Sequence, residues 1–216
     1  MRLTVFGATG GTGTEVVLQA LGTGHQVTAV VRDPARLTVS AGNLTVVTAD
    51  VTDPEAIITA LEGADAAVSA LGRRRIGSAT ISATILTQGV HAILAAMDKT
   101  GVRRLVAVST SRLFPEPGEP PLARYVAKPL LQALLWSAKA DAHRMENLIV
   151  ESPADWTIMR PSRLLDKPRR QYRTALDRAV PNRYGSPPVG RADLADAILK
   201  TLDDPAAIGH RVNIGY

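Results

Sequence analysis

The sequence predicts an α/β fold, a doubly wound parallel sheet with helices on both faces and a small C-terminal cap. Short apolar segments rich in β-branched residues recur along the first two-thirds of the chain, as in strands buried on both faces. Helical segments separate them, which gives the repeated β-α-β order of a parallel sheet. Helix-start signals such as the pair Asp53-Pro54, an N-cap followed by proline, support the helices.

The expected strands are short and apolar. In chain order they are Leu3–Phe6, Gln26–Val31, Leu44–Thr48, Ala66–Ser69, Arg104–Val108, Trp156–Met159 and Arg211–Ile214. The expected helices carry apolar residues at helical spacing. In chain order they are Thr14–Leu21, Ala56–Leu61, Ala79–Met97, Leu122–Trp136, Ala138–Val150 and Asp193–Leu202.

Two segments depart from this alternation. Phe114–Pro121 is a loop with four prolines and two glutamates. Residues 160–190 are rich in arginine, proline and tyrosine and show little periodicity, so we expect them to cap the carboxyl-terminal edge of the sheet. The chain, residues 1–216, is thus expected to form a single domain with this small cap.

The composition excludes several classes of protein. Hydrophobic residues make up 45% of the chain and charged residues 21%, an ordinary globular balance, and no apolar run approaches a membrane span. The chain has no cysteine and its start does not read as a signal peptide, which suits a cytoplasmic protein. The net charge of +5 permits an acidic partner without specifying nucleic acid, and the patterning leaves monomer and homodimer open.

Glycines gather where the first strand meets the first helix, in the stretch VFGATGGTG. Gly7, Gly10 and Gly13 form a G-x-x-G-x-x-G pattern, and this strand–loop–helix context predicts a Rossmann-type site for a dinucleotide pyrophosphate. The missing Cβ atoms allow close approach, and the free N–H groups at the helix start attract an anion. The expected cofactor-binding residues here are Gly7, Thr9, Gly10, Gly11, Thr12 and Gly13, with the Thr14 hydroxyl as a further donor. The alternative is a plain tight turn.

The end of the second strand indicates which dinucleotide binds. Arg32 takes the position where an acid would hold the ribose of NAD, and an arginine there accommodates the 2′-phosphate of NADP. Asp33 reads as an N-cap before Pro34, and Arg36 adds a second cation. The sequence therefore predicts NADP (NADPH) as cofactor, the alternative being that Arg32 is merely solvated.

These motifs together resemble a known family. The segments FGATGGTG, VVRDPARL, ADVTD, ALG, AVSTS and RADLADAILKTLDDP follow one another as in the NmrA-like, atypical short-chain dehydrogenase/reductases. The chain is most similar to the flavin reductase (biliverdin-IXβ reductase) branch, and the resemblance spans nearly its whole length. It implies an oxidoreductase that uses NAD(P)H.

The resemblance also implies roles for individual residues. Asp50 and Val51 match a pair that contacts adenine, although Asp50 also reads as a turn aspartate, and Leu71 and Gly72 match the loop under the adenosine ribose and pyrophosphate. The residues implied beside the nicotinamide are Ser109, Thr110, Ser111, Pro161 and Ser162. Ser111 matches the active-site serine, where a hydroxyl polarises a carbonyl or orients the nicotinamide; the alternative is that these hydroxyls satisfy loop backbone.

Two positions depart from the family pattern. Arg163 stands where the flavin reductase branch has a histidine, which replaces a general acid by a fixed cation and places tetrapyrrole reduction in doubt. The Tyr-x-x-x-Lys pair of common short-chain dehydrogenases is also incomplete, because Lys128 lies three residues after Tyr125 and Pro129 takes the place of the lysine. Tyr125 is nevertheless a catalytic candidate by its separation from Ser111, with an ordinary surface tyrosine as the alternative.

Basic residues gather in two further segments. Arg73-Arg74-Arg75 follows the Leu71-Gly72 loop, and residues 163–183 hold seven basic side chains. Both segments belong at the carboxyl edge of the sheet, so Arg73 and Arg163 are candidate contacts for an anionic small-molecule substrate. A solvated basic face is the alternative. Few aromatics accompany these cations, which argues against nucleic acid, and the four histidines lack metal-ligand spacing.

The sequence thus predicts an NADPH-dependent reductase that transfers hydride to a flat conjugated acceptor such as a flavin or quinone. Ser111 would orient the reacting ring, and such a transfer needs close stacking more than a strong acid. Two alternatives stay open: an NADP-binding redox sensor without turnover, and a non-redox isomerase or epimerase that retains its cofactor.

Overall fold

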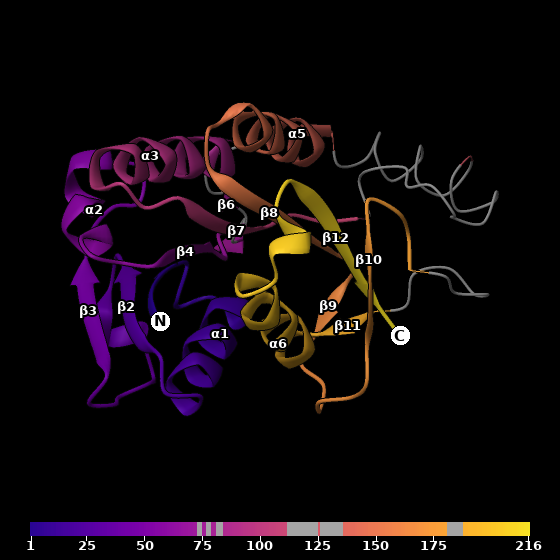
Figure 1. Ribbon diagram of the computed structural model, residues 1–216, viewed down its shortest axis with the longest axis horizontal. Helices are drawn as coiled ribbons and strands as arrows, with labels where there is room; N and C mark the ends of the chain where they lie inside the picture. Colours follow the sequence, from indigo (N-terminus) through magenta and orange to yellow (C-terminus); the bar gives the residue numbers. More distant parts are fainter. Residues whose placement is uncertain (73–74, 77–78, 81–83, 112–124, 126–135, 181–187) are drawn as a thin grey trace.

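The computed structural model describes residues 1–216 apart from 73–74, 77–78, 81–83, 112–124, 126–135 and 181–187 (Figure 1). Its centre is an eight-stranded sheet in the order β10-β12-β8-β7-β4-β1-β2-β3. The strands are β1 (Arg2–Phe6), β2 (Gln26–Val31), β3 (Leu44–Thr48), β4 (Ala66–Ser69), β7 (Arg104–Val108), β8 (Asp155–Pro161), β10 (Arg173–Leu176) and β12 (His210–Gly215). Neighbours pair in parallel except β10, which runs antiparallel to β12.

Helices cover both faces of this sheet, as Figure 1 shows. On one face lie α1 (Gly11–Gly22) and α6 (Arg191–Leu202), and on the other lie α2 (Pro54–Leu61), α3 (Ile85–Thr100) and α5 (Trp136–Glu151). Two short 3-10 helices, η1 (Pro34–Arg36) and η3 (Pro205–Ala207), follow β2 and α6. The predicted Rossmann-type α/β fold is therefore confirmed.

Alternation along the strands divides the core into two layers. In β1, Leu3 and Val5 pack with the α1 and α6 side, whereas Phe6 packs with the α2, α3 and α5 side. Val17 of α1 joins the first layer and Ile93 of α3 joins the second. Because both faces of the sheet centre are buried, the central strands β1, β4 and β7 are largely apolar rather than alternating, whereas the edge strands β3 and β10 are mostly exposed.

Helix boundaries depart from the sequence expectation in two places. Helix α1 begins at Gly11, three residues before the predicted Thr14, so Gly11 and Gly13 of the glycine loop belong to the first helical turn. Helix α3 begins at Ile85 rather than Ala79, since Ala79–Thr80 form strand β6, which pairs with β5 (Arg75–Ile76). The predicted helix Leu122–Trp136 lies outside the described residues except for Tyr125 and for Trp136, where α5 begins.

The described part of the range 160–190, expected as a cap, holds the end of β8 and the short strands β9 (Leu164–Leu165), β10 and β11 (Val189–Gly190). Strand β10 adds an antiparallel edge to the main sheet, and β9 pairs in parallel with β11. The second pairing ties the segment after β8 to the start of α6, which follows β11 directly. No helix within the described ranges is long and apolar enough to cross a membrane.

Candidate functional site

A cavity of about 510 Å³ opens at the carboxyl ends of β1, β2, β4 and β7. This is where the strand order reverses, with β2 on one side of β1 and β4 on the other, and ligands of doubly wound folds bind at such a point. Many predicted site residues line it. They are Gly7, Thr9, Gly10, Gly11, Thr12, Arg32, Val51, Leu71, Gly72, Ser109 and Thr110.

The glycine loop has no room for side chains at two positions. Gly7 has a φ of +79°, and a Cβ built on it would lie 2.6 Å from the Ala70 carbonyl oxygen. A Cβ on Gly13 would lie 2.1 Å from the carbonyl oxygen of Gly7, so α1 packs directly on the end of β1. Gly10 closes the loop by donating its N–H to Gly7 O at 2.9 Å. These contacts give the glycine pattern its physical reason.

The first turn of α1 lies at the cavity and carries backbone N–H groups that every helix start leaves without an intrahelical acceptor. Its first residues are Gly11, Thr12 and Gly13, whose N–H groups have no acceptor within the helix. Together with the helix dipole they favour an anion. The expectation that Thr14 adds a hydroxyl donor is wrong, because that hydroxyl donates to the Ala8 carbonyl at 2.9 Å and holds the loop instead.

The end of β2 places Arg32 on the cavity wall. Asp33 caps η1 as predicted, since its carboxylate accepts the Ala35 N–H at 3.1 Å. Arg36 lies at the end of η1, exposed and apart from the cavity lining. Arg32 therefore provides the positive charge on this wall of the cavity, whereas the Asp33 carboxylate is used to cap η1.

Asp50 and Val51 divide their roles. Val51 is buried and lines the cavity, whereas the Asp50 carboxylate accepts both the N–H and the hydroxyl of Thr52 at 2.9 Å. These two bonds lower the pKa of Asp50, the main-chain bond most strongly, and the charge of Arg32 adds a smaller effect. The Asp50 side chain thus stabilises the turn, in agreement with the alternative interpretation of Asp50 as a turn aspartate.

The opposite wall is held by a buried acid. Asp141 of α5 accepts the N–H groups of Leu86 and Thr87 at 3.1 Å and so fixes the start of α3 beside the cavity. Gly89 of α3 leaves room for Leu71, because a Cβ there would lie 2.5 Å from the Leu71 Cδ1 atom. The sequence pattern missed both residues, which act by supporting the lining rather than by forming it.

Ser109 belongs to a buried polar cluster. Its hydroxyl donates to the Glu146 carboxylate at 2.5 Å, and Glu146 of α5 is 3% exposed. Arg160 of β8, also buried, forms an ion pair with Glu146, and Arg211 of β12 approaches the same carboxylate at 3.4 Å. Because the Ser109 proton points to Glu146, its lone pairs are what the hydroxyl can offer a ligand.

Four predicted residues lie near this wall without lining the cavity. Ser111 and Ser162 are buried, and the Ser111 N–H donates to the carbonyl of Pro161 at 2.8 Å. Arg163 is exposed, and its carbonyl accepts the Val189 N–H at 2.8 Å. These residues lie at or just after the ends of β7 and β8. Because they do not line the cavity, their role in cofactor or substrate binding remains a prediction.

The remaining predicted residues are not brought to the cavity. The Tyr125 residue is 70% exposed and is absent from the cavity lining. Arg73 and Lys128 lie outside the described residues. Among the described residues, Tyr125 therefore does not lie with the predicted cofactor-binding residues that line the cavity.

Sequence reasoning missed one charged residue that does line the cavity. Arg191, the first residue of α6, lies against Gly11 at the start of α1, and its guanidinium pairs with Asp166 at 2.6 Å. The signal was present in the sequence, because RADLADAIL begins a predicted helix after a Val-Gly strand end. What the sequence hid was the packing of α6 beside α1.

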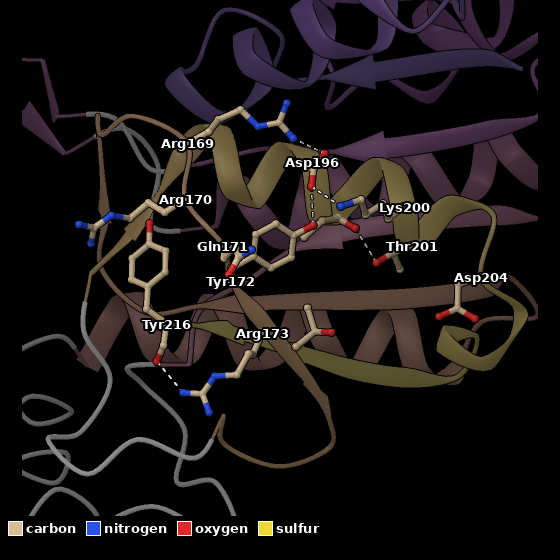
Figure 2. A pocket seen from close by; sticks show the side chains of 12 residues that line it. Arg169, Arg170, Gln171, Tyr172, Arg173, Asp196, Lys200, Thr201, Asp204 and Tyr216 are labelled. Carbon is tan, nitrogen blue, oxygen red and sulfur yellow. Dashed lines mark hydrogen bonds and ion pairs between the residues drawn. The ribbon is translucent and has the colours of Figure 1, made fainter.

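A larger cavity of about 840 Å³ lies beside β10 and the later turns of α6 (Figure 2). Tyr172 points across it to Asp196, donating at 2.6 Å, and Lys200 pairs with the same carboxylate at 2.8 Å. Burial, and then the bond to Asp196, raise the pKa of Tyr172 to about 12. This Tyr–Lys pair therefore holds its proton, unlike an activated catalytic tyrosine.

Three cations of the basic segment line this larger cavity, namely Arg169, Arg170 and Arg173. Arg169 pairs with Asp196, and Arg170 stacks over the Tyr216 ring at 5.2 Å. None of the residues predicted from the glycine loop or the strand ends lies in this lining. Size alone thus does not mark the functional site, and the chemistry favours the smaller cavity.

The fold and the smaller cavity define a class of protein. A glycine loop with no room for a side chain at Gly7 and Gly13, a helix start facing the cavity and a strand order that reverses there are the features of a dinucleotide-binding Rossmann fold.

The NAD(P)H-binding family model matches residues 7–205, and the chain belongs to that family. A relative in Bacillus subtilis (strain 168), the uncharacterized protein YwnB, is 26% identical over 99% of this chain and 98% of its own. The solved structure of a proposed epimerase from Bacteroides thetaiotaomicron is 26% identical, with a TM-score of 0.81 over 100% of this chain and 96% of that one. A short-chain dehydrogenase/reductase from Veillonella parvula DSM 2008, in complex with NADP, is 20% identical with a TM-score of 0.79, over 100% of this chain and 94% of that one.

The family match determines how specifically the function of the chain can be stated. The chain is an NAD(P)H-binding protein, which confirms the nucleotide-binding part of the resemblance. The relatives do not single out the flavin reductase branch, so that narrower resemblance is carried forward only as part of a proposal.

Proposed function

We propose that the protein is an NADPH-dependent reductase whose hydride acceptor is a flat conjugated molecule such as a flavin or a quinone. The proposal has two parts, the choice of NADPH over NADH and the kind of acceptor. Each part is supported by a different group of residues around the cavity of about 510 Å³.

The choice of NADPH is supported by Arg32 and Asp33. Arg32 lines the cavity at the end of β2, where a guanidinium suits a 2′-phosphate. Asp33, the acid that would otherwise suit the ribose hydroxyls of NADH, already accepts the Ala35 N–H. A cation is therefore the group that this strand end offers to the ligand.

The kind of acceptor is supported by one observation above all. Among the described residues that line the cavity, the only ionisable side chains are Arg32 and Arg191. Arginine does not exchange protons usefully near neutral pH, so neither side chain suits a general acid or base. A flat conjugated acceptor fits such a site, because it takes a hydride through close stacking and its proton from water.

The apolar part of the cavity suits the same chemistry. Ile85, Leu86, Ala142 and Leu164 contribute to its lining near Ser109 and Thr110. When bound, the reduced nicotinamide supplies the hydride, and the acceptor gains that hydride and one proton while NADPH becomes NADP⁺. The Ser109 hydroxyl, whose proton goes to Glu146, accepts a hydrogen bond and so holds a carboxamide N–H in place.

The test is a turnover assay on the purified protein. NADPH is mixed with a panel of flavins, quinones and aldehydes, and the absorbance of the reduced nicotinamide is followed. We expect oxidation of NADPH with flavins or quinones and little with simple aldehydes, which need a proton donor. Tight binding of NADPH with no turnover on any acceptor would overturn the proposal in favour of an NADP-binding sensor.

An epimerase is the second candidate, favoured by the 26% identity to the proposed epimerase from Bacteroides thetaiotaomicron. An epimerase keeps its dinucleotide and shows no net consumption of NADPH. It also needs groups that move protons, which the described lining of the cavity does not supply. Incorporation of solvent deuterium at a carbon atom of a compound from the same panel, without oxidation of NADPH, would favour an epimerase over the reductase.

A further inference from the structure

We propose that Arg191 binds the pyrophosphate of the dinucleotide and that Asp166 competes with the pyrophosphate for it. The proposal deepens the cofactor site and rests on the proposed binding of NADPH, from which its two probes are chosen, but it does not depend on the acceptor. Neither residue belongs to the glycine loop, and both come from the chain after β8.

Strand pairing places the two residues opposite each other. Strands β9 and β11 run parallel with Leu164 opposite Val189 and Leu165 opposite Gly190. The next residues in this register are Asp166 and Arg191, and their side chains pair at 2.6 Å between Arg191 Nη1 and Asp166 Oδ1. The register of the two strands therefore brings this ion pair to the first residue of α6.

The Arg191 side chain runs across the start of α1. A Cβ built on Gly11 would lie 2.8 Å from both Cδ and Nε of Arg191. Gly11 is the first residue of α1, so the guanidinium lies beside the N–H groups that favour an anion. The missing side chain of Gly11 thus leaves room for this arginine beside the start of α1.

The position of Arg191 is held from α1 itself. Gln19 of α1 donates its side-chain N–H to the carbonyl of Ala192 at 2.9 Å, which ties the start of α6 to α1. The Arg191 side chain is 28% exposed and lines the cavity, so it is neither fully solvated nor shut away from a ligand. A planar guanidinium of this kind suits the paired oxygens of a pyrophosphate.

Asp166 is a weak partner by comparison. Its side chain is 89% exposed, and an exposed ion pair contributes little to stability. A pyrophosphate brings two charges to the same guanidinium and meets the α1 N–H groups as well. Cofactor binding therefore draws Arg191 toward the phosphates, while Asp166 lowers the affinity by competing for the guanidinium and by its own negative charge.

The test measures binding by calorimetric titration, with NADPH and with adenosine 2′-monophosphate, which lacks the pyrophosphate. We expect Arg191→Met to weaken NADPH binding by about 10- to 100-fold, the worth of charge-assisted hydrogen bonds, and to leave the adenosine 2′-monophosphate constant unchanged. Arg191→Lys, which keeps the charge, should restore part of the loss. The matched control is Arg2→Met, an exposed arginine paired with Asp65 at the opposite edge of the sheet.

Asp166→Asn supplies the converse result. We expect it to tighten NADPH binding by about 2- to 5-fold, as the loss of an exposed pair allows, with no change for adenosine 2′-monophosphate. Asp65→Asn is its control. Wild-type NADPH affinity in Arg191→Met, or equal loss for both ligands in Arg191→Met and Arg191→Lys, would overturn the proposal. Turnover on flavins or quinones is measured separately. If no acceptor is reduced, the binding titrations still test the role of Arg191.

Discussion

Gly13 lies against Gly7 so closely that a Cβ on Gly13 would stand 2.1 Å from the Gly7 carbonyl oxygen. The oxygen belongs to backbone that is itself fixed, because Gly7 has a φ of +79° and contacts the end of β4. The first helix thus packs on the first strand with no side chain between them, and this contact sets where the helix start faces the cavity.

We expect Gly13→Ala to lower the free energy of unfolding by about 1–3 kcal/mol, the usual cost of forcing atoms into a packed contact. It should also abolish NADPH binding, because α1 must move away from the loop. The control is Gly22→Ala in the same helix, where an added Cβ meets nothing within 4 Å. Urea unfolding and a binding titration check both variants, and equal behaviour of the two would contradict the packing argument.

Arg32 decides the choice between NADPH and NADH in the proposed function. We expect Arg32→Asp to weaken NADPH binding by about 10- to 100-fold, through loss of charge-assisted hydrogen bonds to a 2′-phosphate, and to favour NADH. Dissociation constants for both cofactors measure the shift. Arg36→Asp makes the same charge change beside the cavity and should have the smaller effect, since Arg36 does not line it. An unchanged preference in Arg32→Asp would remove Arg32 from the site.

Local patterns were enough for the parallel strands of the main sheet and for the glycine loop, but not for the edge strand β10. Strands such as Gln26–Val31 and Arg104–Val108 have the predicted bounds, because apolar β-branched runs between turns leave little choice. The loop could be predicted because strand, glycines and helix are consecutive in the chain. Asp33 and Asp53 were likewise predicted as N-caps from their own neighbours, and their carboxylates accept the expected N–H groups.

Features set by distant contacts could not be predicted. Arg191 reaches the cavity because β9 pairs with β11, two dipeptides whose pairing no periodicity signals. The start of α3 was placed too early, since Ala79–Thr80 are held as a strand by pairing with β5. Ser109 is oriented by Glu146, which the sequence offers only as one acid among many on a helix. For Arg191 and Ser109 a long-range partner overrides the local pattern, whereas the β5–β6 pairing is a contact between neighbouring segments that the helical pattern hid.

The buried cluster around Glu146 should be the most sensitive polar group of the described core. Glu146→Gln keeps the shape and can still accept from Ser109, but it removes the buried negative charge that pairs with the guanidinium of Arg160. We expect a loss of about 3–5 kcal/mol in the free energy of unfolding, as for other broken buried pairs. Urea unfolding measures it, with Glu151→Gln as control, an exposed glutamate at the end of the same helix. A loss below about 1 kcal/mol would show that Arg160 is adequately solvated or paired without Glu146.

Tyr172 should titrate later than an ordinary tyrosine. Burial, and then the hydrogen bond to Asp196, raise its pKa from 10.0 to about 12. Because the folded pKa lies above the unfolded one, the stabilisation is present below pH 10.0 and is lost as the pH rises toward about 12. The phenolate absorbance of the wild type minus that of Tyr172→Phe reports this one group directly.

Asp196→Asn extends the test of Tyr172. It removes the negative charge beside the phenol and keeps Lys200 close to the ring, at 5.4 Å from its centre. We expect the pKa of Tyr172 to fall in this variant, whereas Asp203→Asn, on the exposed residue after α6, should leave it unchanged. A wild-type Tyr172 that ionises at or below pH 10.0 would contradict the assignment. It would also make Tyr172 a candidate proton donor, because an activated tyrosine needs a lowered pKa.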